Sequence, residues 1–260
     1  MSSKIAKKKK VRLDLLLVER GVVATAKEAE GLILSGQVRV AGTPLSKVGM
    51  PVDPDAILEI KGKQAFASRG GLKLAAALDA FSVSARAKIC ADVGCSSGGF
   101  TDVLIQGGAA KVFAIDVGYG DLAWHLRSNP NVVVMERTNA TQLQSLPETI
   151  DLISIDVSLL SLRKVLPVVK HWLSANGEIV ALVKPQYEAR PDQLPEGAVI
   201  EDAAVHTEIV TALLEFCAAE GLFAHGLIAS PIRGMGGNKE FLVHLNKESQ
   251  GAFSVPQLIQ

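Results

Sequence analysis

The sequence predicts an α/β protein in which a mostly parallel, doubly wound sheet follows a small α+β module. The 260 residues are 48% hydrophobic, which is enough apolar material for one large core or two ordinary ones. From Lys88 onward, short apolar runs bounded by turn residues alternate with helical segments, a rhythm typical of a parallel sheet with helices on both faces. Before that point, two helical patterns precede two strand-like segments.

The elements of the N-terminal module are indicated by periodicity and capping. Apolar residues recur at helical spacing over 12–20, and a glycine then ends the pattern. Thr25 with Glu28 three residues later predicts a capping box for a second helix. Strands are expected at 38–40, where valines alternate with polar residues, and at 56–60.

Charge is unevenly distributed along the chain. Residues 1–63 contain 12 Lys and Arg against 7 Asp and Glu, whereas the rest of the chain contains 15 against 20. A basic end on an acidic body favours a protein that holds a polyanion at one end, because phosphate contacts supply most sequence-independent affinity for nucleic acids. The Lys-rich residues 1–10 are expected to be a disordered basic tail.

The cysteines and the N-terminus bear on location. Cys90, Cys95 and Cys217 are odd in number, widely spaced and set in apolar sequence, so neither a disulfide framework nor a zinc knuckle is expected. The basic start lacks the apolar segment of a signal peptide, and no later run is long enough to span a bilayer. We therefore expect a cytoplasmic protein with no membrane partner.

The first strand of the α/β half leads into a glycine-rich loop, DVGCSSGGFTD. Its spacing matches neither G-x-G-x-x-G nor the lysine-containing phosphate loop, so dinucleotide and ATP chemistry lose support. An acidic residue with such a loop fits a ligand with a cationic amino-acid end and a ribose, as in S-adenosylmethionine; a purely structural turn is the alternative. The candidate cofactor residues here are Asp92, Gly94, Ser96, Gly98, Gly99 and Phe100.

Two more polar residues follow the next two strands. Asp116 ends the second strand, where its carboxylate could accept hydrogen bonds from both hydroxyls of a ribose. Asn139 follows the third strand and could bind adenine, although an Asn at such a place is more often part of a turn. Together with the glycine loop, these residues predict a nucleoside site.

Four ionisable residues stand at the ends of elements. Asp156 and Lys184 end strongly apolar strands, and the carboxyl ends of parallel strands border the ligand crevice. Lys73 lies in a helix that begins with two glycines, and Glu240 precedes a late apolar run. Each alone could be a surface ion pair, but four together predict a catalytic site. Lys73 is expected off the buried stripe of its helix, which we assign to Leu72, Ala75, Ala76 and Leu78.

These motifs resemble known families. The RLD start, the Gly-x-Val-x-Val turn and Lys47 resemble the S-four-type RNA-binding domain of a ribosomal protein, pseudouridine synthases and some tRNA synthetases, over residues 11–60. The four ionisable residues resemble the Lys-Asp-Lys-Glu tetrad of FtsJ-like RNA 2'-O-methyltransferases. From Arg12 to Leu245 the chain is similar to the haemolysin A (TlyA) family in SRGGLKL, DVGCSSGGFTD, DVGYGDLAW, ERTNA, DVSLLSL, VKPQYE and GNKEFL.

The resemblance implies a Rossmann-like class I methyltransferase fold behind a small α+β RNA-binding domain. The tail at 1–10 would precede an S-four-like domain at 11–62, and a linker with a helix at 63–85 would lead into the next domain. The methyltransferase domain would span 86–247, and a C-terminal tail would occupy 248–260.

The resemblance further implies S-adenosylmethionine-dependent methylation of cytidine ribose in ribosomal RNA. The partners would be ribosomal RNA or ribosomal subunits, and the oligomeric state is left open. A ribose hydroxyl is a poor nucleophile and a sulfonium methyl is already electrophilic, so the task is deprotonation and in-line positioning, which needs no metal. Lys184 is the candidate base, and Lys73 would keep its amine poorly protonated and orient the hydroxyl. Asp156 and Glu240 would hold the lysines in register, and the choice of base between the lysines stays open.

Three other functions remain as alternatives. The first is an inactive RNA-binding factor in ribosome assembly that keeps the fold. The second is a haemolysin, which the missing signal peptide, spanning helix and amphipathic hairpin oppose. The third is methylation of a base, a protein or a small molecule; DVSL differs from the Asn/Asp-Pro-Pro-aromatic segment of base amino-group enzymes.

A connector over 61–68 that becomes ordered on RNA would couple cofactor affinity to RNA binding.

Overall fold

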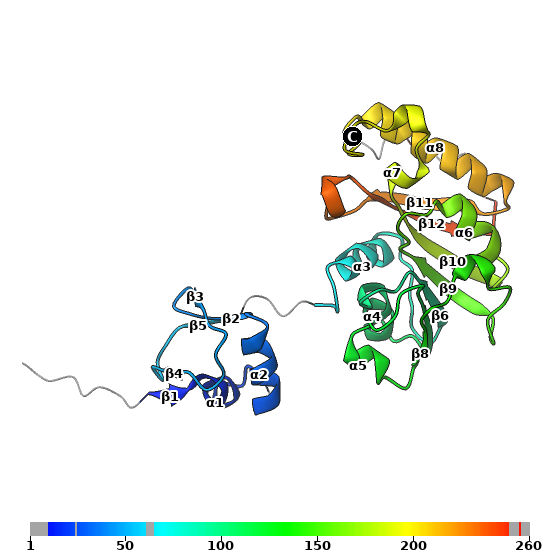
Figure 1. The fold of residues 1–260 in the computed structure, drawn as a ribbon. Coiled ribbons are helices and arrows are strands. Elements are labelled where there is room, and N and C mark those ends of the chain that lie inside the picture. Colours follow the sequence, from blue (N-terminus) through cyan, green and yellow to red (C-terminus); the bar gives the residue numbers. More distant parts are fainter. Residues whose placement is uncertain (1–9, 24, 61–64, 250–254, 256–260) are drawn as a thin grey trace, which may run out of the picture. The chain divides into compact units, whose positions relative to one another are not determined.

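The computed structural model describes residues 10–23, 25–60, 65–249 and 255. The chain forms two compact units that divide between Ala65 and Phe66 (Figure 1). Most of the predicted tails at 1–10 and 248–260, and residues 61–64 of the predicted connector, lie outside the described residues.

The first unit is a small α+β module. Thr25 caps its second helix, since its Oγ1 accepts a hydrogen bond from the Glu28 amide at 3.2 Å. β1 pairs with β4, and β2 pairs with both β3 and β5, all antiparallel. Leu13, Leu17 and Ile33 are fully buried between the helices and the strands. The predicted helices and strands are confirmed as α1 (Leu13–Glu19), α2 (Ala26–Leu34), β2 (Val38–Val40) and β5 (Leu58–Ile60), joined by β1 (Val11–Arg12), β3 (Thr43–Pro44) and β4 (Pro51–Val52).

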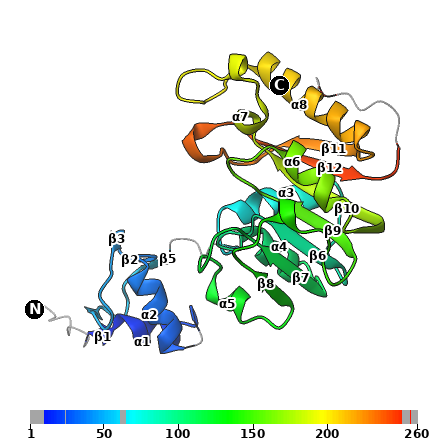
Figure 2. The same ribbon diagram turned by 45° about the vertical axis from the view of Figure 1, so that its right-hand side comes forward.

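The second unit contains a seven-stranded sheet in the order β11-β12-β10-β9-β6-β7-β8 (Figures 1 and 2). The five strands from β10 to β8 in that order are parallel, which confirms the predicted mostly parallel sheet. β12 runs antiparallel to both of its neighbours, β10 and β11, and neither β11 nor β12 was predicted. The segment that joins β11 to β12 holds only the short 3-10 helix η3 and no α-helix, so the two strands pair as neighbours. The strands are β6 (Ile89–Val93), β7 (Lys111–Ile115), β8 (Val132–Met135), β9 (Ile150–Ile155), β10 (Leu173–Val183), β11 (Phe223–Ala229) and β12 (Phe241–Asn246).

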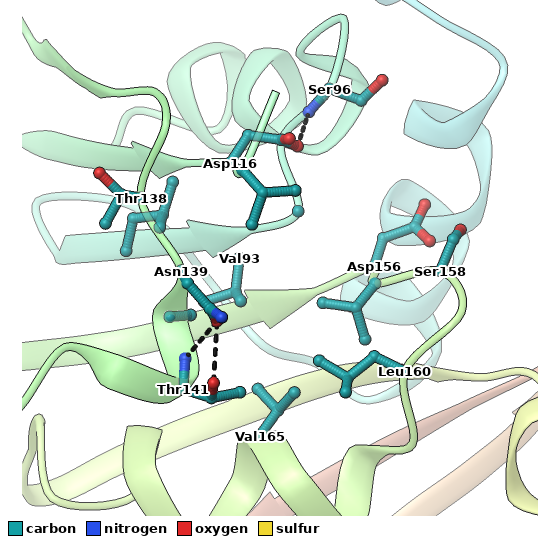
Figure 3. A pocket seen from close by; sticks show the side chains of 15 residues that line it. Val93, Ser96, Asp116, Thr138, Asn139, Thr141, Asp156, Ser158, Leu160 and Val165 are labelled. Atoms are coloured by element: carbon teal, nitrogen blue, oxygen red, sulfur yellow. Dashed lines mark hydrogen bonds between the residues drawn. The ribbon is translucent and has the colours of Figure 1, made fainter. Parts of the chain in front are cut away.

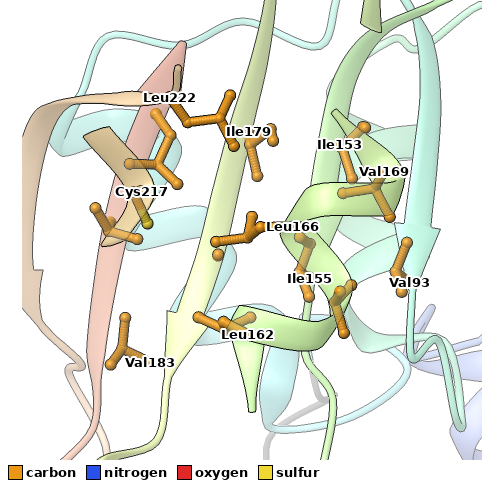
Figure 4. Packing of buried hydrophobic residues seen from close by; sticks show 14 of the residues in the cluster. Val93, Ile153, Ile155, Leu162, Leu166, Val169, Ile179, Val183, Cys217 and Leu222 are labelled. Atoms are coloured by element: carbon orange, nitrogen blue, oxygen red, sulfur yellow. The ribbon is translucent and has the colours of Figure 1, made fainter. Parts of the chain in front are cut away.

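Helices cover both faces of this sheet. On one face, α6 inserts Leu166 and its neighbours between the side chains of β9 and β10 (Figure 4). Truncating a fully buried leucine such as Leu166 to alanine costs roughly 2–5 kcal/mol. α6 (Leu162–Val169) and α8 (Ala203–Ala219) cover this face, while α3 (Gly70–Ala80), α4 (Gly99–Gln106) and α5 (Trp124–Arg127) cover the other. The short elements are α7 (Pro185–Glu188), η1 (Ala140–Gln142), η2 (Pro191–Gln193) and η3 (Met235–Gly237).

The buried stripe of α3 differs from the predicted one. Leu72 is 44% exposed, whereas Lys73 is buried, so the prediction was wrong for both. The helix is oriented by a close contact at its start, because a Cβ on Gly71 would lie 2.4 Å from the Phe66 Cβ. Since Phe66 packs here, residues 70–80 turn a different face to the sheet. The buried residues are Gly71, Lys73, Leu74 and Ala77, and the predicted Ala75, Ala76 and Leu78 are only half-buried.

The order of strands creates a crevice at one edge of the sheet. From β6 the chain continues outward to β7 and β8, and then crosses to β9 on the other side of β6. Ligands of doubly wound sheets bind outside the carboxyl ends of the strands where the order reverses in this way. The site is therefore expected at the ends of β6, β7 and β9. Among the described helices, none is long and apolar enough to cross a membrane.

Candidate active site

Two hollows lie side by side at this edge of the sheet. The first, of about 280 Å³, is bordered by the ends of β6, β7 and β9 and by η1; we call it the β7 pocket (Figure 3). The second, of about 350 Å³, is bordered by the start of α3, the glycine loop and the segment before β12; we call it the α3 pocket. Gly94, Ser96 and Asp156 line both hollows, so the two share a wall.

The glycines let the loop approach its neighbours closely. Gly94 has a φ of +87°, and a Cβ there would lie 2.4 Å from the carbonyl oxygen of Asp156. A Cβ on Gly98, with a φ of +96°, would lie 2.3 Å from Leu126. Only glycine meets both the positive φ and the close approach at these positions. The predicted Gly99 and Phe100 line the α3 pocket, whereas Gly98 lines neither hollow.

Asp116 lies where the sequence placed it, after β7 and beside the β7 pocket. Its Oδ2 accepts a hydrogen bond from the Ser96 amide at 2.8 Å (Figure 3). Its Oδ1 accepts one from the Gly118 amide at 2.7 Å. The carboxylate is half-buried and is held in position by these two amides. Each carboxylate oxygen keeps one lone pair, which is what a vicinal diol needs as an acceptor.

Asn139 also lines the β7 pocket, but its side chain serves the local turn. The amide oxygen accepts hydrogen bonds from the backbone and the hydroxyl of Thr141, at 3.0 and 2.9 Å (Figure 3). This is the usual capping role of an Asn before a short helix.

Asp92 lies beneath the glycine loop. It is fully buried, lines neither hollow, and accepts hydrogen bonds from Thr101 Oγ1 at 2.6 Å and Ser154 Oγ at 2.9 Å. Burial raises the pKa of Asp92 to about 7. Side chains alternate along β6, and Asp92 shares with Cys90 the face that α3 and α4 cover. Its position at a strand end did not reveal this orientation.

The four ionisable residues form two ion pairs. Lys73 Nζ lies 2.5 Å from Glu240 Oε2, and Lys184 Nζ lies 2.6 Å from Asp156 Oδ1. Lys73, Lys184 and Glu240 are all buried, and buried charges are expensive unless they are paired in this way. Lys73 and Asp156 both line the α3 pocket, so one residue of each pair faces the same hollow.

Two polar residues that the sequence reasoning did not single out support this arrangement. Ser158 Oγ accepts a hydrogen bond from Lys184 Nζ at 2.8 Å. Glu188 accepts hydrogen bonds from Ser161 Oγ and from the Leu162 amide, both at 2.7 Å, and burial raises its pKa. Glu188 thus ties the segment after Lys184 to the start of α6. Ser158 lies within the motif DVSLLSL and Glu188 within VKPQYE, and these motifs were the only sequence signal that could have identified the two residues.

The cysteines lie in environments that disfavour a thiolate. Cys90, Cys95 and Cys217 are buried. Burial raises the pKa of Cys90 and of Cys217 to about 12, and raises that of Cys95 further. None of the three is suited to act as a nucleophile near neutral pH.

The sheet order, the glycine loop and the polar groups at the carboxyl edge define a Rossmann-like methyltransferase domain. A solved Listeria monocytogenes protein, provisionally named an S-adenosylmethionine-dependent methyltransferase, shares this fold with a TM-score of 0.53 at 15% identity, covering 69% of this chain and 99% of its own. Residues 66–247 match the FtsJ-like methyltransferase family, and residues 11–58 match the S4 domain. The chain therefore belongs to the FtsJ-like methyltransferase family and carries an S4 domain at its N-terminal end.

Relatives along nearly the whole chain identify the group within that family. The 16S/23S rRNA (cytidine-2'-O)-methyltransferase TlyA of Mycobacterium tuberculosis is 39% identical over 254 residues, covering 96% of this chain and 95% of its own. Hemolysin A of Brachyspira hyodysenteriae is 33% identical, covering 90% and 99%. A solved Streptococcus thermophilus protein, provisionally named a hemolysin, is 37% identical with a TM-score of 0.73, covering 98% and 94%. The chain is a member of the TlyA (haemolysin A) group.

Proposed function

We propose that this protein transfers a methyl group from S-adenosylmethionine to the ribose 2'-hydroxyl of a cytidine in ribosomal RNA, in the cytoplasm. The observation that supports it most is the pairing of two buried lysines with two carboxylates, with Lys73 and Asp156 both bordering the α3 pocket beside the glycine loop. Paired amines in a partly desolvated hollow suit proton transfer from a weakly acidic hydroxyl.

The β7 pocket fits the nucleoside part of the cofactor. It combines the Asp116 carboxylate with apolar walls that include Ile115 and Val165, which is the mixture that a ribose and a purine require. Asp116 would bind the ribose hydroxyls, Asn139 would border the adenine, and the loop at 94–96 would hold the amino-acid part. When bound, S-adenosylmethionine supplies an electrophilic methyl group.

Lys184 and Lys73 would divide the remaining work. We assign Lys184 as the base: in its neutral form its amine would take the proton of the 2'-hydroxyl as that oxygen accepts the methyl group, and Asp156 at 2.6 Å would stabilise the ammonium ion that results. Ser158 fixes the amine from a second direction. Lys73, held by Glu240, would orient the hydroxyl, so each carboxylate keeps one lysine in position.

The S4 domain would supply affinity for the RNA. Residues 1–63 contain 12 basic against 7 acidic residues, and the S4 match covers 11–58 within them. Phosphate contacts of this kind are largely independent of sequence. The proposed partners are therefore ribosomal RNA or ribosomal subunits.

The test is methyl transfer from labelled S-adenosylmethionine to ribosomal subunits that lack the modification. We expect wild-type protein to label RNA, and nuclease mapping to place the label on the 2'-oxygen of a cytidine. Label on a base or on a ribosomal protein would contradict the proposal. If the folded protein bound no cofactor with or without subunits, an RNA-binding assembly factor would replace it.

A further inference from the structure

The α3 pocket contains two cations that the proposed chemistry does not use. Arg69, at the start of α3, and Arg233, in the segment before β12, both line it. Both side chains are exposed, and within the described part of the chain neither forms an ion pair with a carboxylate. They are thus available to a ligand.

The other charges of this hollow are already balanced. Lys73 is paired with Glu240, and Asp156, which is the only carboxylate among the described lining residues, is paired with Lys184. The two arginines are therefore an excess of positive charge. This excess stands out because the chain after residue 63 contains 15 basic against 20 acidic residues. An excess of positive charge in a hollow attracts an anion.

Both arginines are fixed close to the ion pairs by the backbone that bears them. Arg69 precedes Gly70, where a Cβ would lie 3.9 Å from Asp156 Oδ2. Arg233 precedes Gly234, where a Cβ would lie 2.0 Å from Glu240 Oε1, so this segment passes directly over that carboxylate. The guanidinium of Arg233 also donates a hydrogen bond to the Gly237 carbonyl at 2.7 Å, which restrains it.

The chemistry of RNA supplies an anion at this place. In an RNA chain every internal 2'-hydroxyl is next to a 3'-phosphodiester, so a phosphate must accompany the reacting hydroxyl into the site. The β7 pocket has no lysine or arginine among its described lining residues, which leaves the α3 pocket as the place for the acceptor strand. Arginine suits this task because its planar guanidinium can bind two phosphate oxygens at once.

We infer that Arg69 and Arg233 form an oxyanion subsite that binds a backbone phosphate of the acceptor RNA beside the methylated ribose. The inference rests on the proposed function. The carboxylate of the cofactor's amino-acid end has the same chemistry, and it is the other possible source of an anion here. The two sources differ in what the arginines control: the affinity for RNA or the affinity for S-adenosylmethionine.

The experiment compares full-length Arg69→Ala and Arg233→Ala with Arg86→Ala, an exposed arginine just before β6, at the opposite end of the parallel strands. We expect each pocket variant to raise the KM for unmethylated ribosomal subunits about tenfold. Each should reduce the slope of log KM against log salt by about 0.7–0.9, the value for one lost phosphate contact. The dissociation constant for S-adenosylmethionine, measured by calorimetry without RNA, should stay within about twofold. Arg69→Lys should recover part of the salt slope, since it restores the charge.

The outcomes separate the two claims. If the cofactor dissociation constant rises as much as the KM, the anion is the cofactor's carboxylate and the subsite is wrong. If wild type transfers methyl groups and the pocket variants match Arg86→Ala, the subsite alone is overturned. If wild type transfers none to any subunit, the proposed function falls and the subsite falls with it.

Discussion

The two hollows at the carboxyl edge of the sheet have opposite charge characters. The β7 pocket is lined by the carboxylates Asp116 and Asp156 and by apolar side chains, whereas the α3 pocket is lined by Arg69, Lys73 and Arg233 around Asp156. A cofactor that carries positive charge suits the first hollow and a polyanion suits the second. Asp156 stands in the wall between them, which is where a methyl donor and an acceptor of opposite charge must meet.

The largest expected effect is at Lys184, which is ion-paired with Asp156 in the wall that the two hollows share. Lys184→Met removes the proposed base and should lower the rate of transfer about a thousandfold, within the range for loss of a general base. Cofactor affinity should change little, because Lys184 is not among the residues that line the β7 pocket. Single-turnover transfer with saturating subunits measures the chemical step.

Lys164→Met is the matched control, since Lys164 is exposed on α6. A fall of less than tenfold for Lys184→Met would remove that lysine from the role of base. The same assay with Lys73→Met would then show whether the other lysine takes that role.

The shared wall offers the next largest effect. Gly94→Ala places a Cβ 2.4 Å from the Asp156 carbonyl oxygen at a φ of +87°. The added methyl group should push the end of β9 away and so change the shape of both hollows. We therefore expect weaker cofactor binding. We also expect kcat/KM to fall about a hundredfold, which corresponds to roughly 3 kcal/mol of strain. Calorimetry and steady-state transfer measure the two effects.

Gly120→Ala separates strain from collision. Gly120 has the same φ of +87° but nothing within 4 Å of a Cβ. If the two variants lose the same activity and thermal stability, backbone strain alone explains the loss and the close approach of β6 to β9 is unimportant for the site.

The charge contrast between the hollows predicts a one-sided effect at Asp116. Asp116→Asn weakens the acceptor for a ribose diol, and it should reduce cofactor affinity about ten- to a hundredfold, the range for a hydrogen bond to a charged group. The KM for subunits should not change. Asp121→Asn, an exposed acid on the same loop, is the control. An equal change in both affinities would show that the hollows are not separate binding sites.

Much of this edge could be predicted from the sequence because strand ends are visible in it. Apolar runs locate the parallel strands, and parallel strands bring their carboxyl ends to one edge, so Asp116, Asp156 and Lys184 were placed correctly at the sheet. Lys73 and Glu240 were also singled out at the ends of elements, and the family resemblance grouped all four, but the ion pair of Lys73 with Glu240 joins residues far apart in the chain. No local pattern contains such a contact.

The sequence did not predict the orientation of a helix face or a side chain where tertiary contacts determine it. The contact of Phe66 with Gly71 sets which face of α3 is buried, against the periodicity of its apolar residues. The antiparallel strands β11 and β12 were not predicted, and Arg233, in the segment that joins them, was therefore not expected at the α3 pocket. Asp92 was predicted as a cofactor residue from its place near a strand end, and that place did not show that the face of β6 to which it belongs lies beneath the loop.

The smallest expected effect is at Asp92. It tests whether this acid beneath the loop affects stability alone, whereas the acids that line the hollows affect ligand binding. Burial raises its pKa from the ordinary value of 3.8 to about 7 in the folded protein. Between these values the folded state holds a proton that the unfolded state has released, so this group makes the protein less stable as pH rises from about 4 to about 7. Asp92→Asn keeps partners for the Thr101 and Ser154 hydroxyls but cannot ionise.

We expect thermal unfolding of Asp92→Asn to depend less on pH in this window, and its melting temperature at pH 8 to equal or exceed that of wild type by a few degrees. Melting curves from pH 4 to 8 by circular dichroism measure this. Cofactor affinity should be preserved, because Asp92 does not line the β7 pocket. A tenfold loss of that affinity with no change in the pH profile would mean that Asp92 acts on the ligand directly, as the position at the end of β6 first indicated, and that the loop shifts when the cofactor binds.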